Sequence, residues 1–203
     1  QETLMTKRLL SLPALAGILA ATLLSAAPVQ AKELTLASPL PPGHRFTPSY
    51  IQAYADKLNE VSGGKLTVKV FNGGSLNPSI PKQYSMLLDG VFDIAFVAPI
   101  YTAPVFPTTN TVSVPGVCDS AESCTKSLWR AYPLIEKETN AKILAMWTNE
   151  SPALITKGKA VRSSADMQNI KVRISGPSEA PYWSAMGAAP VSQEVTEINQ
   201  NLA

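Results

Sequence analysis

Residues 34–71, LTLASPLPPGHRFTPSYIQAYADKLNEVSGGKLTVKVF, decide the fold. Residues 34–38 at the start and 65–71 at the end alternate apolar with polar or small side chains, as strands do. Between them, apolar residues recur at steps of three and four after Thr47-Pro48, which predicts a helix with Thr47 as its N-cap and proline in its first turn. The stretch therefore predicts a β-α-β unit, the building block of a parallel sheet.

The rest of the chain continues to alternate short apolar runs with amphipathic segments. This order predicts a doubly wound α/β architecture. Strands are expected at residues 92–98, 142–148, 153–156, 170–175 and 189–192. Helices are expected at residues 81–89, from about 119 to a break at Pro133, at 178–186, and from 194 onward.

The first 31 residues have the composition of a secretory signal peptide. A basic Lys7-Arg8 head precedes an uncharged Leu- and Ala-rich run, and Val29-Gln30-Ala31 then offers the short side chains that a signal peptidase requires. A membrane anchor is the alternative, because the run is nearly long enough to span a bilayer. Pro13 and Gly17 interrupt it, however, so we expect cleavage after Ala31 and export of the remainder.

The charge of the chain is almost balanced, with 17 Lys and Arg against 15 Asp and Glu. Such a balance offers no electrostatic footprint for nucleic acid or for anionic lipid. No second apolar run is long enough to span a membrane, so the mature protein is expected to be soluble and to comprise one ordinary domain or parts of two.

The two cysteines, Cys118 and Cys124, lie close together in the sequence. In an exported protein such a pair indicates a disulfide, with free thiols as the alternative. A metal site would need more ligands at regular spacing. The helix that follows Cys118 is expected to begin near Asp119 or Ser120, with Glu122 completing a capping box on Asp119.

Signatures of catalysis are scarce. Hydrolytic triads and zinc sites generally need histidine, and the only one, His44, lies in a loop rich in proline and glycine. The glycines near residues 73–75 and 176–178 do not match a nucleophile elbow, and no dinucleotide or phosphate-loop fingerprint occurs. We therefore expect no catalytic residue, no bound metal and no cofactor.

Arg173 stands out among the basic residues. It lies near the carboxyl end of the strand predicted at residues 170–175, and open α/β sheets bind ligands beyond such ends. A guanidinium there offers a planar, permanently charged fork to a carboxylate. From position alone, an ion pair with a surface acid is equally expected.

Several segments, taken in their order and spacing, resemble the solute-binding proteins of TRAP transporters, the DctP family. They are SGGKL (62–66) leading into VKVF (68–71), LDGVFDIA (88–95) with its G-x-x-D pattern, PIY (99–101) with Phe106-Pro107, VRS (161–163) with ADM (165–167), and IKVRI (170–174) followed by GAAPV (187–191). The resemblance extends from residue 34 to residue 202, nearly all of the mature chain.

The resemblance implies a periplasmic-binding-protein-like fold, with two α/β lobes, mostly parallel sheets and flanking helices around a cleft. It implies a first lobe over residues 32–148 and a partial second lobe over residues 149–203, in a C-terminally truncated chain. Apolar faces around Val172, Ile174 and Ile198 are then expected to be partly uncovered. The implied location is the periplasm, and the implied partners are a small organic acid and the integral membrane subunits of a TRAP transporter.

The resemblance also implies a ligand site. Arg173 matches the family's arginine that forms a salt bridge with the ligand's carboxylate, and the loops that carry His44 and Tyr101 match loops that line the cleft. This sequence has Ala153 where some members place a second arginine, and Asn199 where the family usually has tyrosine. It also lacks the acid that sialic acid binders carry near Ala98.

Two other functions remain open at this point. A periplasmic sensor subunit that presents its ligand to a receptor would have the same architecture. A small exported hydrolase is the alternative from another class, although it would be expected to carry a second histidine near an acid or a serine.

Overall fold

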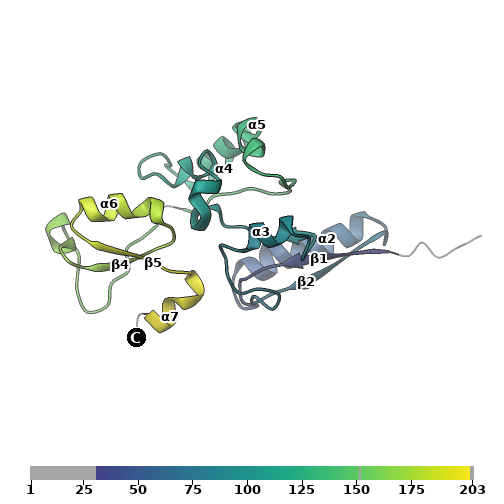
Figure 1. Cartoon of the computed structure of the whole chain (residues 1–203), viewed down its shortest axis with the longest axis horizontal. Helices are drawn as coiled ribbons and strands as arrows, with labels where there is room; N and C mark the ends of the chain where they lie inside the picture. The colour runs from purple at the N-terminus through teal and green to yellow at the C-terminus, as the bar shows by residue number, and fades with distance from the viewer. Residues whose placement is uncertain (1–30, 151, 202–203) are drawn as a thin grey trace, which may run out of the picture.

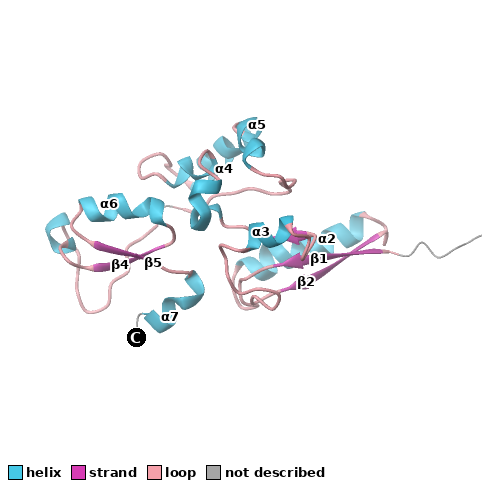
Figure 2. Cartoon of the chain, in the orientation of Figure 1, coloured by secondary structure: helices cyan, strands magenta, loops and turns pink. Residues whose placement is uncertain are grey.

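The structure is a computed structural model that describes residues 31–150 and 152–201 (Figure 1). Two parallel sheets lie at opposite ends of the long axis in this view, and the helices α4 and α5 lie above the region between them. One sheet has three strands in the order β2-β1-β3, and the other pairs β4 with β5. Figure 2 shows how much of the chain between these elements runs as loops. The signal peptide predicted over the first 31 residues lies, but for its last residue, outside the described part.

The helices and strands have the following bounds. The strands are β1 (Lys32–Ala37), β2 (Leu66–Phe71), β3 (Ile94–Ala95), β4 (Lys171–Ile174) and β5 (Ala189–Ser192). The α-helices are α2 (Ala53–Val61), α3 (Gln83–Leu88), α4 (Ala121–Arg130), α5 (Tyr132–Ile135), α6 (Ala180–Ala185) and α7 (Ile198–Asn201). Tighter or wider helical turns are η1 (Thr47–Gln52), η2 (Pro99–Val105), η3 (Thr109–Ser113), η4 (Glu136–Glu138), η5 (Ser164–Met167), η6 (Pro177–Glu179) and η7 (Val195–Glu197).

The predicted β-α-β unit is confirmed. Strand β1 pairs in parallel with β2, so that Leu36 lies opposite Val70, and the helical segment η1–α2 connects the two strands. The residues Leu36, Leu40, Ile51, Ala55 and Val68 form the buried core between this helix and the sheet. The apolar stripe on the helix therefore covers the sheet as the sequence periodicity predicts.

The predicted start of this helix is wrong by one residue. The residue before the helix is Phe46, and Thr47 is already helical. The hydroxyl of Thr47 donates to the carbonyl of Pro41 at 2.9 Å, so this side chain ties the helix to the preceding loop and does not cap it. Pro48 still lies in the first turn, where its missing N–H leaves no intrahelical bond unmade.

The strand predicted at residues 92–98 is shorter than expected, because only Ile94 and Ala95 pair with β1. Strand β1 ends at Ala37, and Pro99 begins the helical turn η2 shortly afterwards. Just before β3, Asp93 and Thr35 form several hydrogen bonds with one another. The Thr35 N–H and hydroxyl donate to the Asp93 carboxylate at 2.8 and 2.9 Å, and the Asp93 N–H donates to the Thr35 carbonyl at 3.1 Å.

These hydrogen bonds give the aspartate of the G-x-x-D segment a structural role. They also predict that the stability of the fold depends on pH. The backbone and hydroxyl hydrogen bonds from Thr35 lower the Asp93 pKa below its ordinary 3.8. Because the folded-state pKa is the lower one, the stabilisation is complete above the unfolded pKa and is lost as pH falls through the folded pKa. Asp93→Asn should therefore lower the free energy of unfolding by about 1 kcal/mol at neutral pH, since the pair is exposed.

Urea unfolding at pH 7 and again below about pH 4 measures this difference. The difference in the free energy of unfolding between wild type and Asp93→Asn should be smaller at the lower pH. Thr35→Ser keeps both donors, so its free energy of unfolding should match that of the wild type. A difference of the same size at both pH values would contradict the assignment.

The strands predicted at residues 142–148 and 153–156 are wrong, since neither segment pairs with a strand in the described part of the chain. The first segment is bound to α4 instead. Its Thr148 N–H donates to the Thr125 hydroxyl at 3.0 Å, and the Trp129 indole donates to the Met146 carbonyl at 2.9 Å. The second segment lies open, with Ile155 89% exposed.

The second sheet and its helix are as predicted. Strands β4 and β5 are parallel, with Arg173 opposite Val191, and α6 connects them. Val172 and Ile174 are only 5% and 1% exposed, because Met167, Ala188 and partly buried neighbours pack against them. The expectation of partly uncovered apolar residues is therefore wrong for Val172 and Ile174, whereas Ile198 is partly exposed.

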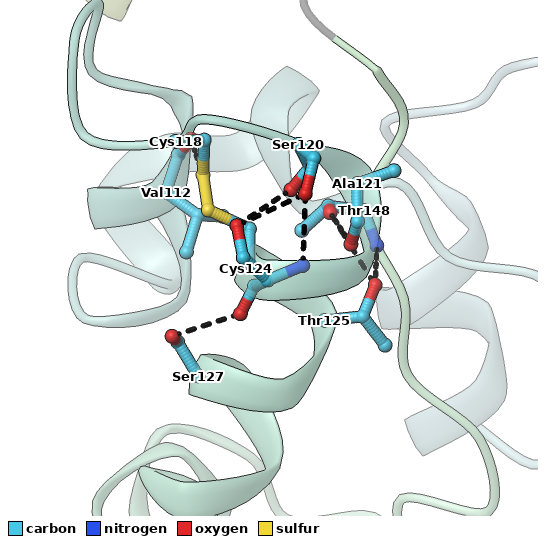
Figure 3. Close-up of a disulfide and its surroundings, with 9 residues drawn as sticks. Val112, Cys118, Ser120, Ala121, Cys124, Thr125, Ser127 and Thr148 are labelled. Atoms are coloured by element: carbon cyan, nitrogen blue, oxygen red, sulfur yellow. Dashed lines mark hydrogen bonds between the residues drawn. A yellow bond between two sulfur atoms is a disulfide. The ribbon is translucent and has the colours of Figure 1, made fainter.

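The disulfide between Cys118 and Cys124 is confirmed, and it lies against the first turn of α4 (Figure 3). The two Cα atoms are 5.6 Å apart. The helix begins as expected near this pair, but its cap is Ser120, whose hydroxyl accepts the Ser123 N–H at 3.2 Å, so the capping box on Asp119 is wrong. At the other end, α4 stops at Arg130 before Pro133, as predicted.

Removing the disulfide should lower the free energy of unfolding by about 2 kcal/mol, because it closes only a short loop in the unfolded chain. The double variant Cys118→Ala/Cys124→Ala, compared with wild type by urea unfolding, measures this loss. Reductant should bring the wild type to the level of the variant and leave the variant unchanged. Mass spectrometry of non-reduced peptides from exported protein that finds both thiols free would contradict the prediction.

In the described part of the chain no helix has both the length and the apolar character needed to cross a bilayer.

Candidate ligand-binding site

Arg173 lies on β4, one residue from its end, and its half-buried guanidinium is held from several sides. Its Nε and Nη2 both donate to the Gln193 carbonyl, at 3.0 and 2.6 Å. Its Nη1 donates to the Ser175 hydroxyl at 3.2 Å, and its Nη2 also donates to the Tyr101 hydroxyl at 2.7 Å. Four hydrogen bonds from a planar fork leave the group little freedom to rotate.

No carboxylate of the described residues lies within 4.0 Å of the Arg173 nitrogens; the ion pairs of that part are Lys57–Glu60 and Lys126–Glu122. The nearby acid Glu179 is turned to the backbone, where it accepts the N–H groups of Ser175 at 3.0 Å and Gly176 at 3.4 Å. The surface ion pair that position alone allowed is therefore not formed within residues 31–150 and 152–201. The hydrogen-bond acceptors around the guanidinium are instead neutral: the Gln193 carbonyl and the Ser175 and Tyr101 hydroxyls.

Tyr101 connects the turn η2 to the second sheet, because it contacts Arg173 on β4 and Val195 after β5. It lies in η2, more than seventy residues before Arg173, and its hydroxyl accepts both the Arg173 Nη2–H and the Val195 N–H, the latter at 3.2 Å. Its ring also lies 5.9 Å from the guanidinium carbon, within the range of a cation–π contact. Of the three residues expected to bind ligand, the structure thus brings Arg173 and Tyr101 together.

A cavity of about 300 Å³ opens beside this pair. Half-buried Arg173 borders it through three hydrogen-bond partners, Tyr101, Ser175 and Gln193, which form part of its wall. The cavity is lined by Pro81, Tyr101, Ser175, Pro177, Ser192, Gln193, Glu194 and Glu197. It lies beyond the carboxyl ends of β4 and β5, where parallel sheets generally bind ligands.

His44 lies elsewhere. It lines a second cavity, of about 350 Å³, whose other walls include Thr196 and Asn199. Its Nδ1 accepts the Phe46 N–H at 3.2 Å, so in the neutral form its proton is on Nε2. The structure therefore separates His44 from Arg173 and Tyr101, although residues 193–199 contribute to both cavities.

The first residue that the sequence analysis missed is Glu194, which follows β5. Its carboxylate accepts the Ser79 hydroxyl at 3.1 Å and the Ile80 N–H at 2.9 Å. The loop that carries Ser79 and Ile80 is held from its other side by buried Gln83, which donates to the Asn77 and Ser79 carbonyls. No local pattern points to a pair so far apart in sequence, and only the folded chain reveals it.

Gly176 is the second missed residue. A Cβ built on it would lie 2.0 Å from the carbonyl oxygen of Ile100, the residue before Tyr101. The loop after β4 and the turn η2 thus approach each other so closely that only glycine fits. In the described part of the chain, no three His, Cys, Asp or Glu side chains gather as metal ligands would.

Residues 41–203 match the family described as bacterial extracellular solute-binding protein, family 7, or DctP. The chain belongs to this family. The resemblance seen in the sequence is thereby confirmed. The C4-dicarboxylate-binding protein DctB of Bacillus subtilis is 29% identical over 157 residues, which are 73% of this chain and 44% of the relative.

Solved structures of the family share the fold. The chain aligns with a TRAP solute-binding protein from Rhodoferax ferrireducens in complex with copurified benzoate at a TM-score of 0.78 and 23% identity, covering 83% of this chain and 53% of that one. A TRAP periplasmic protein from Pseudomonas putida F1 with bound D-glucuronate gives a TM-score of 0.69 at 26% identity, covering 82% and 56%. The periplasmic-binding-protein-like α/β fold is therefore confirmed, and the chain spans about half the length of these relatives.

Proposed function

We propose that this protein captures a small organic acid outside the cytoplasmic membrane and delivers it to the integral membrane subunits of a TRAP transporter. One observation carries the proposal. Arg173 holds a permanent positive charge beside a cavity, and no carboxylate of the described residues forms an ion pair with it. A bound carboxylate would complete this arrangement, because it is the natural partner of a guanidinium held in place.

Two hydrogen-bond donors are left over at the site. An arginine has five N–H groups and four bonds are made, which leaves one N–H on Nη1 without an acceptor in the described chain. The Tyr101 hydroxyl accepts two hydrogen bonds, but its own hydrogen has no acceptor among the described residues. In our proposal a ligand carboxylate accepts from both groups, and no bond of the ligand is made or broken.

The relatives support the class of ligand. The Bacillus subtilis relative is named for C4-dicarboxylates, and the two solved structures hold benzoate and D-glucuronate, so that all share a carboxylate. The family is extracellular by description, which agrees with the signal peptide expected over the first 31 residues. The division into lobes at residues 32–148 and 149–203 remains a prediction. Closure of two lobes over the acid would be a hinge motion.

A thermal-shift screen of the full protein tests the proposal. Pairs of an acid and its uncharged amide, such as benzoate with benzamide, serve as matched ligands. Acids that bind should raise the melting temperature, because a ligand that binds only the folded state stabilises it by about 2.7 kcal/mol at a hundred times its Kd. Equal shifts for acid and amide, or no shift with any acid, would overturn the proposal.

A further inference from the structure

The described lining of the cavity beside Arg173 is acidic. It includes Glu194 and Glu197 but no lysine or arginine. Glu194 is half-buried, and one of its oxygens accepts from Ser79 while the other accepts from Ile80. Because these donors bind the carboxylate in place, the side chain cannot easily swing away from an approaching anion.

The site therefore combines a cation, Arg173, with two acids, Glu194 and Glu197. Arg173 and the Tyr101 hydroxyl offer donors to one carboxylate, whereas Glu194 and Glu197 are acceptor-only groups when ionised. A second carboxylate on the ligand would meet these acids with no lysine or arginine of the described lining to offset them. A hydroxyl or an ammonium group would instead donate to them.

We propose that the site selects monocarboxylates that carry a further hydrogen-bond donor, a hydroxyl or an ammonium group, and discriminates against dicarboxylates. This inference rests on the proposed function, since it takes carboxylate capture by Arg173 and Tyr101 as given. It also separates this protein from its Bacillus subtilis relative, which is named for C4-dicarboxylates. Glu194 is then the residue that determines specificity, by repulsion as much as by attraction.

Calorimetry of the full protein with two matched series at pH 7 tests the inference. Phenylacetate, mandelate, phenylglycine and phenylmalonate differ only in the group on one carbon, which is hydrogen, hydroxyl, ammonium or carboxylate. D-Gluconate and D-glucarate, both open chains, differ at C6, which carries a hydroxyl in the first and a second carboxylate in the other. Mandelate or phenylglycine, or D-gluconate in the second series, should bind at least about tenfold more tightly than the matched dicarboxylate.

Variant Glu194→Gln removes the charge and keeps one oxygen that can accept the Ile80 N–H. It should reduce the ratio of the dicarboxylate Kd to the monocarboxylate Kd by about tenfold. Glu60→Gln, on the exposed face of α2, is the matched control and should leave this ratio unchanged. Should Glu194→Gln fail to fold, Glu197→Gln removes the other acid of the cavity and leaves the Ser79 and Ile80 bonds untouched.

The outcomes separate this inference from the function on which it rests. If the dicarboxylates bind as tightly as their monocarboxylate partners, or if the glutamine variants leave the ratio of the two Kd values unchanged, the specificity is overturned while carboxylate capture stands. If no acid of either series binds, the proposed function itself fails, and the inference fails with it.

Discussion

Arg173→Ala should weaken the binding of a carboxylate ligand by about 2–5 kcal/mol, which is the scale for losing one partner of a buried charge pair. This corresponds to an increase in Kd of about 30-fold to about 5,000-fold. The loss should be large because the guanidinium is held by Gln193, Ser175 and Tyr101, so that binding costs little ordering of the side chain. Calorimetry with an acid identified in the thermal-shift screen measures the change.

The comparison with other cations makes this prediction specific. Arg173→Lys keeps the charge but loses the fork, so it should also bind weakly. Arg162→Ala and Lys171→Ala, which remove exposed cations of the same part of the chain, should bind like the wild type. Circular dichroism should show that Arg173→Ala still folds. If Arg162→Ala or Lys171→Ala abolishes binding while Arg173→Ala does not, the wrong cation has been assigned.

The parts of the fold that could be predicted are those encoded by local patterns. The β-α-β unit follows from period-two and period-3.6 spacing within residues 34–71, and Gly63-Gly64 does end the helix, with φ of +60° and +77°. The disulfide follows from two cysteines in a chain that is expected to be exported. In each case the residues that determine the structure lie close together in the sequence.

The predictions that failed depended on neighbours that spacing does not reveal. Residues 142–148 are largely apolar and of strand length, yet Thr125 and Trp129 bind their backbone to α4, because a strand needs a partner edge that this segment does not have in the described chain. Thr47 is of a residue type that favours the N-cap, yet its hydroxyl donates to the Pro41 carbonyl instead of capping the helix. Local propensity was overridden by tertiary contact in both places.

The candidate site could be predicted only in part, and for the same reason. Position on a strand end pointed to Arg173, and resemblance to the family pointed to Tyr101, but neither showed that the two side chains bind each other. The contact of Glu194 with Ser79 and Ile80 joins residues more than a hundred positions apart. It is set by how β5 meets the loop before α3, and that meeting is a property of the whole fold.

Gly176→Ala should destabilise the protein by about 3 kcal/mol, at the upper end of the usual cost of inserting an atom into a filled space. The backbone at Gly176 is extended, with φ of −143°, so an alanine could adopt it without strain. The obstacle is the Ile100 carbonyl oxygen, 2.0 Å from where the new Cβ would lie. A backbone atom cannot rotate away as a side chain can, so η2 or the loop after β4 must move.

Because Ile100 precedes Tyr101, that movement should also separate Tyr101 from Arg173 and weaken acid binding. Urea unfolding monitors the first effect and calorimetry the second. Gly43→Ala is the matched control, since its Cβ would meet nothing within 4 Å and its φ is not positive. It should leave stability unchanged or raise it by about 0.4–1 kcal/mol, because alanine restricts the unfolded chain. Equal unfolding midpoints for Gly176→Ala and Gly43→Ala would mean that η2 does not pack against the loop after β4 in solution.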